Sequence, residues 1–263
     1  MGKHSSPGPQ EKRFAAYMDG LAQAAGHADR ATPLKLYCTG LLLPGERKSV
    51  EPMAARLAPD NVRRMHQSLH HVVADAPWSD EQVLAQVRSY ALTAMRQKGR
   101  LQAWVVDDTG FPKKGTQSVG VTRQYCGQVG KQENCRVAVS LSVSTRTASL
   151  PIAWRLYLPE EWANDKARRG QAGVPAEITF ETKPSIALQQ IRSAVEQEVP
   201  RAPVLADAAY GIDTRFREAI SELGLPYVVG IMSSVSVWKP GEAPLAKPKW
   251  QGSGAPQQAF AAQ

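Results

Sequence analysis

The spacing of apolar residues in this 263-residue chain changes at residue 101, and the change limits the folds it can adopt. Up to about residue 100, apolar residues such as Phe14, Tyr17 and Met18 recur every three or four positions, as in amphipathic helices. Beyond that point, short β-rich runs alternate with helical segments. The pattern predicts an all-helical N-terminal domain over 11–100, followed by an α/β domain over 101–238.

Capping residues indicate where several of the expected helices begin and end. Asp60 and Ser79 each precede a helical pattern and are good N-caps, and Gly99 is a typical terminator. The ends of the chain lack such patterns. Residues 1–10 are predicted to be a disordered tail, and residues 239–263 a Pro/Gly-rich tail with little to bury.

The second part is expected to contain a mixed sheet with flanking helices. The run LQAWVVDD predicts a buried strand that ends at two acids, and CRVAVSLSVSTRTASLPIAWRLYLP predicts a hairpin with strands 135–144 and 150–158. The charged stretch over 160–173 is predicted to be a loop. The short run VLAD is predicted to be another strand, between two amphipathic helices.

Two of the expected strands end in acids, which makes Asp107, Asp108 and Asp207 candidate site residues. Ligands of open α/β sheets bind at the carboxyl ends of strands, so these side chains would converge if the strands are neighbours. Paired carboxylates are tolerable when they share a proton or bind a cation, and their oxygens suit Mg²⁺ or Mn²⁺. The alternative is that each aspartate caps the turn or helix that follows it.

The overall charge favours a polyanionic partner. Lysine and arginine exceed aspartate and glutamate by 8, and the pI is near 9.5. No apolar run approaches the roughly 20 residues needed to span a bilayer, so no membrane association is expected. Three sparse cysteines indicate a reducing compartment, which makes a cytoplasmic protein the expectation.

Several segments together resemble bacterial insertion-sequence transposases of the DDE type, specifically the insertion sequence 701 branch. The motifs that carry the resemblance, in chain order, are DDTGFPKKG, YCGQVGK, ETKPSIALQQI and VLADAAYGIDTRFR. The resemblance implies a ribonuclease-H-like catalytic domain that cleaves and transfers DNA strands with Mg²⁺. It also implies double-stranded DNA partners, namely transposon ends and target, association with the bacterial nucleoid, and allows a homodimer on the DNA.

Carried over by position, the resemblance places the first catalytic aspartate at Asp108, with Asp107 as the alternative, and the second at Asp207. The third acid of the family, a glutamate on a later helix, has no clear counterpart. Glu242 lies in a Pro/Gly stretch, and Glu218 is the nearest other candidate. We therefore expect a truncated or frameshifted transposase that is inactive alone. The alternatives are a non-catalytic DNA-binding protein derived from a transposase and, more remotely, an unrelated phosphohydrolase.

Four basic residues are candidates for DNA contact. Lys113 and Lys114 follow the paired acids, and Arg63 and Arg64 lie in a helical pattern of the N-terminal part, which is expected to bind the transposon ends. A solvated turn and an exposed helix face would produce the same patterns, so both interpretations stay open.

Overall fold

The computed structural model describes residues 8–235 of the chain. The predicted tail over 239–263, with Glu242, lies outside the described residues, as do the first seven residues. The last two residues of the predicted N-terminal tail over 1–10 belong to helix α1, which begins at Pro9. A proline at the first helical position suits its fixed φ, and the Glu11 carboxylate accepts a hydrogen bond from the Gly8 N–H at 2.8 Å.

Helices fill the chain from Pro9 to Lys98, as the apolar spacing predicted. Ser79 caps the last of them, and Gly99 ends it. The predicted cap at Asp60 is wrong, because Pro59–Asn61 form a 3₁₀ turn and Asn61 occupies the N-cap position of the next helix, without a capping hydrogen bond from its side chain. The helices are α1 (Pro9–Ala24), α2 (Ala28–Leu42), α3 (Val50–Leu57), α4 (Val62–Ala74) and α5 (Asp80–Lys98).

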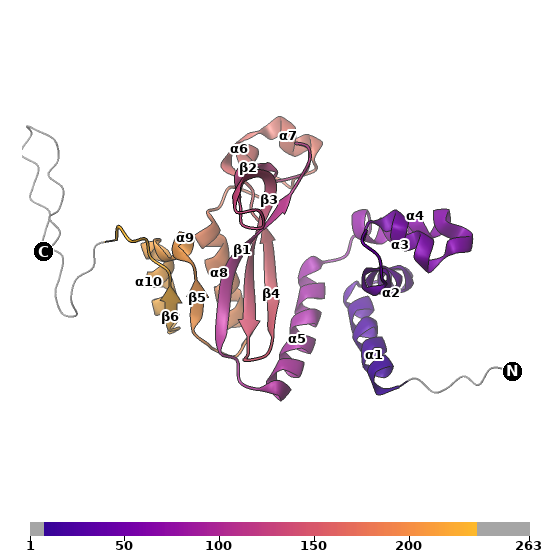
Figure 1. Ribbon diagram of the computed structural model, residues 1–263, viewed down its shortest axis with the longest axis horizontal. Helices are drawn as coiled ribbons and strands as arrows, with labels where there is room; N and C mark the ends of the chain where they lie inside the picture. Colours follow the sequence, from indigo (N-terminus) through magenta and orange to yellow (C-terminus); the bar gives the residue numbers. More distant parts are fainter. Residues whose placement is uncertain (1–7, 236–263) are drawn as a thin grey trace, which may run out of the picture.

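Helix α5 packs against both parts of the chain (Figure 1). Its Tyr90 ring lies 4.7 Å, centroid to centroid, from Tyr17 of α1. Five residues further along the helix, Met95 is buried in the core under the sheet, together with Trp104. The helical part also has apolar clusters of its own, with Met18 and Leu69 among their buried members. The helix thus connects two cores that the chain builds separately.

Six strands form one mixed sheet in the order β2-β3-β1-β5-β6, with β4 also paired to β3 (Figure 1). The central strand β1 is antiparallel to β3 and parallel to β5, and β6 is parallel to β5. The fold is therefore mixed α/β with helices flanking a mixed sheet. The strands are β1 (Ala103–Pro112), β2 (Thr122–Cys126), β3 (Lys131–Ser144), β4 (Ser149–Leu156), β5 (Val204–Ala206) and β6 (Tyr227–Val229).

Strand β1 does not end at the paired acids, and this corrects the sequence-based prediction. It continues through Asp107 and Asp108 to Pro112, paired with β3 along its whole length. The two acids interrupt the apolar run, so the run predicted only the first half of β1. Strand β2 was also missed, because its polar residues TRQYC lack an apolar run.

The two faces of the sheet differ in composition. Side chains alternate between faces along a strand, so Trp104 and Val106 share one face with Asp108. Helix α8 (Lys183–Glu196) covers this face, and its Gln190 amide donates to the Val139 carbonyl at 3.0 Å. We call it the helix-covered face. Register places the large exposed apolar residues of the described strands on the opposite, open face: Phe111, Tyr125, Trp154, Leu156 and Val228.

The predicted loop over 160–173 is instead two short helices, α6 (Glu160–Asn164) and α7 (Lys166–Gln171). The Asp165 carboxylate caps α7 by accepting from the Arg168 N–H at 2.9 Å. Trp162 anchors α6, since it is fully buried and its indole N–H donates to the Val121 carbonyl at 2.8 Å. Among residues 8–235, no helix is both long and apolar enough to cross a bilayer.

Candidate active site

The adjacent acids of β1 lie on opposite faces of the sheet. Asp108 is half-buried on the helix-covered face, and Asp107 is exposed on the open face. The Asp107 carboxylate turns back to accept a hydrogen bond from the backbone N–H of Asp108 at 2.7 Å. Only one of the two carboxylates can therefore face the helices that follow β5.

Asp108 is held by two donors from distant parts of the chain. One carboxylate oxygen accepts a hydrogen bond from the Tyr210 hydroxyl, and the other forms an ion pair with the Lys183 ammonium. Tyr210 lies on the short helix α9 (Ala208–Gly211), and Lys183 is the first residue of α8. These contacts fix the orientation of the Asp108 carboxylate.

Asp207 directly follows β5, the parallel neighbour of β1. Trp104 and Val105 pair with Val204 and Leu205, which brings the end of β5 beside the acids of β1. The Asp207 side chain is exposed and caps α9, accepting from the Ala209 N–H at 2.9 Å. The capping interpretation is therefore confirmed for Asp207, and it is compatible with a second role because a carboxylate has about four lone-pair positions.

The pKa of Tyr210 reports on the electrostatics around the three acids. Burial, the hydrogen bond to Asp108 and the negative charges of Asp108, Asp207 and Asp107 together raise the pKa of Tyr210 well above its usual value. The phenol therefore remains a hydrogen-bond donor at physiological pH. The negative charges of all three aspartates contribute to this shift, although Asp107 and Asp108 lie on opposite faces of the sheet.

Two glycines allow α9 to lie close to the end of β6. A Cβ on Gly211 would stand 1.9 Å from the Gly230 carbonyl oxygen, and a Cβ on Gly230 would stand 2.8 Å from the Ala208 nitrogen. No side chain fits at either position without moving the backbone. This close packing sets the position of α9, and with it Asp207 and Tyr210.

A third carboxylate does not join the aspartates within residues 8–235. No group of three or more histidine, cysteine, aspartate or glutamate side chains in this part of the chain is arranged to hold a metal ion. Glu218 of helix α10 (Thr214–Glu222) is exposed, whereas Phe216, Ala219 and Ile220 form the buried side of that helix. Glu242 lies outside the described residues.

The candidate DNA-contacting residues lie apart from the acids. Lys113 is five residues beyond Asp108, about 17 Å along an extended strand. Its backbone is fixed by Asn134, whose amide donates to the Lys113 and Gly115 carbonyls at 2.7 and 2.9 Å. Lys114 is exposed, and Arg63 and Arg64 are exposed on α4. The structure leaves all four available to solvent but does not bring them to the acids.

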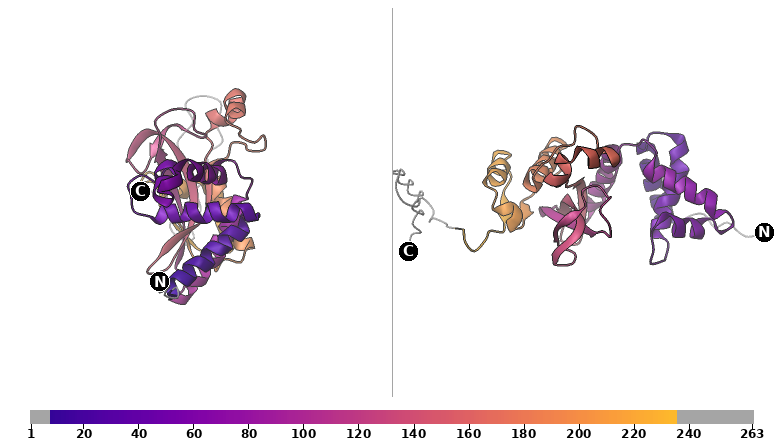
Figure 2. Two further views of the ribbon diagram at one scale, coloured as in Figure 1. Left: turned by 90° about the vertical axis from the view of Figure 1, so that its right-hand side faces the viewer. Right: turned by 90° about the horizontal axis from the view of Figure 1, so that it is seen from above.

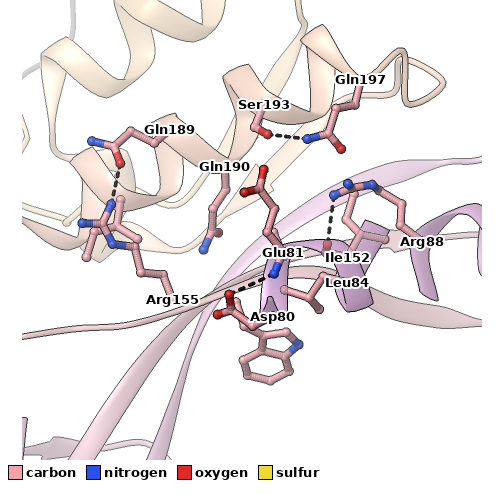
Figure 3. Close-up of a pocket in the computed structure, with 13 residues that line it drawn as sticks. Asp80, Glu81, Leu84, Arg88, Ile152, Arg155, Gln189, Gln190, Ser193 and Gln197 are labelled. Carbon is pink, nitrogen blue, oxygen red and sulfur yellow. Dashed lines mark hydrogen bonds between the residues drawn. The ribbon is translucent and has the colours of Figure 1, made fainter. Parts of the chain in front are cut away.

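A cleft of about 530 Å³ lies between α5, β4 and α8 (Figure 3). Asp80 and Glu81 of α5 line it opposite Gln190 of α8. None of Asp107, Asp108 and Asp207 contributes to its lining. The cleft is therefore separate from the candidate site.

Sequence reasoning missed Tyr210 and Lys183 as members of the site. Both occur in segments that carry the family resemblance, VLADAAYG and ETKPS, but neither residue type alone indicates a role. A tyrosine three residues after a strand-end aspartate and a lysine at a helix start are common. Tyr210 and Lys183 lie 102 and 75 positions from Asp108 in the sequence, so their contacts with it become visible only in the folded structure.

Comparison with known proteins shows the family of the chain. A family model described as DDE superfamily endonuclease matches residues 20–262. The chain is also 33% identical, over 192 residues, to the "Probable transposase for insertion sequence element IS701" of Microchaete diplosiphon. The chain belongs to the DDE superfamily of endonucleases, and it is similar to a probable insertion sequence 701 transposase.

The match to the Microchaete diplosiphon protein covers 72% of this chain and 46% of that protein. The chain thus spans about half the length of the curated relative that it matches. The resemblance stated from the sequence motifs is confirmed at the level of the family.

The residues present fit a divalent cation in their donor chemistry. Carboxylate oxygens are the ligands that Mg²⁺ prefers; Asp207, which directly follows β5, is exposed, and Asp108 of the neighbouring strand β1 is half-buried. Each oxygen that accepts a hydrogen bond here keeps a second lone pair. Asp108 and Asp207 would hold the ion, and the Lys183 ammonium is the cation that lies against Asp108 in this structure.

Proposed function

We propose that this chain carries part of the catalytic machinery of an insertion-sequence transposase. In this proposal, Asp108 and Asp207 are the metal-binding carboxylates, with Asp107 as the alternative to Asp108, and the metal is Mg²⁺ or Mn²⁺. A bound ion of this kind would activate a water or hydroxyl nucleophile and stabilise the leaving oxygen of a phosphodiester. Residues 101–238 would form a ribonuclease-H-like catalytic domain, which the mixed sheet with flanking helices supports.

The observation that carries the proposal is the parallel pairing of β1 with β5. It brings the end of β5, which Asp207 follows, beside the strand that carries Asp107 and Asp108, and the negative charges of the three aspartates help raise the pKa of Tyr210. Tyr210 holds the Asp108 carboxylate in one orientation, and the cap on α9 does the same for Asp207. Preorganised carboxylates of this kind reduce the reorganisation needed to bind a cation and a phosphate.

We further propose that the chain alone does not cleave DNA, because residues 8–235 supply no third carboxylate to the site. In-line phosphoryl transfer commonly uses two metal ions, and two aspartates leave the second ion poorly held. The helical segment over 11–100 would bind transposon ends through residues such as Arg63 and Arg64, and Lys113 and Lys114 would contact phosphates.

The second candidate function is a non-catalytic DNA-binding protein derived from a transposase. The same observation favours it, since residues 8–235 supply no third carboxylate, which cleavage would need and DNA binding would not. A small-molecule phosphohydrolase finds no support in the family to which the chain belongs.

A cleavage assay tests the proposal. The purified chain is incubated with a DNA fragment that contains its own gene and the flanking genomic sequence, in Mg²⁺ or Mn²⁺. We expect retarded migration of fragments from the gene boundaries and no strand cleavage. Cleavage that Asp108→Asn abolishes would contradict the inactivity of the chain alone but support the site. A complete lack of DNA binding at low salt would contradict both candidate functions.

A further inference from the structure

Lys183 is placed rigidly against Asp108 by the start of helix α8. It is the first residue of the helix, after the cap Thr182, whose hydroxyl accepts from the Ser185 N–H at 3.3 Å. Pro184 follows and fixes the backbone. The lysine side chain is 29% exposed, and its ammonium lies 5.5 Å from the centroid of the Tyr157 ring. The ammonium is therefore held between a carboxylate and an aromatic face.

The neighbouring acid, Glu181, does not share this ammonium, because other groups occupy it. Its carboxylate forms an ion pair with Arg155 at 2.5 Å and accepts hydrogen bonds from Ser185 and Gln189. Within residues 8–235, Lys183 forms an ion pair only with Asp108. Two separate charge pairs thus lie side by side at the start of α8.

We propose that Lys183 is a resident counter-cation that competes with a divalent metal ion for Asp108. This inference rests on the proposed function, in which Asp108 is a metal ligand. The Lys183 ammonium touches the carboxylate oxygen opposite the one held by Tyr210, so both oxygens have a donor before any ion arrives. An incoming Mg²⁺ or Mn²⁺ is repelled by the ammonium until the lysine moves away. Lys183 is a positioning residue, because it acts on the metal only through the Asp108 carboxylate.

Competition predicts that removing Lys183 raises metal affinity, whereas a purely structural ion pair predicts no such rise. If Lys183 only joined α8 to β1, its removal would lower stability and leave metal affinity unchanged or weakened. If Lys183 competes with the metal, its removal lowers stability without metal and strengthens metal binding. Metal affinity, measured apart from any activity, therefore separates the two roles.

The test is a calorimetric titration of the full chain with Mn²⁺ in the absence of DNA. The variants are Lys183→Met, which removes the charge, and Lys183→Arg, which keeps it. Lys183→Gln is a second neutral variant in case Lys183→Met does not fold. The matched control is Lys131→Met, since Lys131 forms an ion pair with Glu133 at 3.6 Å in a strand, with 67% of the lysine side chain exposed.

We expect the neutral variants to bind Mn²⁺ at least about fivefold more tightly than the native chain, and Lys183→Arg and Lys131→Met to match it. Equal or weaker binding by a folded neutral variant would overturn the inference. Asp108→Asn tests the metal site separately from the role of Lys183. If it leaves Mn²⁺ affinity unchanged, the proposed site itself fails; if it weakens binding while Lys183→Met has no effect, only the role of Lys183 fails.

Discussion

The Tyr210 hydroxyl donates a hydrogen bond to the Asp108 carboxylate, which joins the end of α9 to the middle of β1. Tyr210 is 1% exposed, so water cannot replace the bond in Tyr210→Phe without entering the core. We expect this variant to lose about 1 kcal/mol in the free energy of unfolding, measured by urea denaturation. Tyr125→Phe is the control, because Tyr125 is 61% exposed. A loss of the same size in that variant would show that the effect does not come from the bond between Tyr210 and Asp108.

Asp108→Asn and Asp207→Asn should each weaken Mn²⁺ binding at least about tenfold while the chain stays folded. Asparagine is as good an N-cap as aspartate, so Asp207→Asn preserves the start of α9 and removes only the charge. Calorimetry measures the affinity, and circular dichroism checks the fold. Glu218→Gln, which removes an exposed carboxylate, should bind as the native chain does; unchanged affinity in both aspartate variants would defeat the assignment.

Gly211→Ala should destabilise the protein by about 1–3 kcal/mol, because the new methyl group would overlap the Gly230 carbonyl oxygen. Urea denaturation measures the effect. Gly127→Ala is the matched control, since a Cβ there meets no atom within 4 Å. If the two variants were equally stable, the close approach of α9 to the end of β6 would not be what positions Asp207.

Stability should decrease as the pH rises from about 9 to about 11. Burial, the nearby Cys126 thiol and a hydrogen bond with it raise the pKa of Cys135 to about 11. In this window the unfolded thiol ionises while the folded thiol keeps its proton, so the folded state binds more protons and the free energy of unfolding falls with pH. The slope of that free energy against pH, from urea titrations, should be smaller in Cys135→Val; an identical slope would contradict the shift.

Replacing both Lys113 and Lys114 with alanine should lower DNA affinity and its dependence on salt. Each lost phosphate contact reduces the slope of log affinity against log salt by about 0.9. The same holds for the double alanine variant of Arg63 and Arg64. Fluorescence anisotropy at several salt concentrations measures the slope. An unchanged slope in either double variant would show that those residues are solvated surface and nothing more.

The sequence indicated the helices of the first hundred residues and most of the strands because apolar spacing reports burial directly. It did not reveal where β1 ends, since the acids interrupt the apolar run while the backbone pairing with β3 continues. The three aspartates could be named from strand ends and family motifs. Tyr210 and Lys183 could not, because their roles depend on the parallel pairing of β1 with β5 and on the position of α8, which no local pattern encodes.

Side chains alternate along β1, so the adjacent acids Asp107 and Asp108 are not interchangeable. Asp107 and Asp108 are neighbours in the chain, yet the thickness of the sheet separates their carboxylates, so neither can replace the other while the register with β3 holds. Deletion of one residue just after them would leave the pair intact, whereas deletion of one residue just before them would exchange their faces. The duplication thus offers a spare acid only to a chain whose strand has slipped by one position.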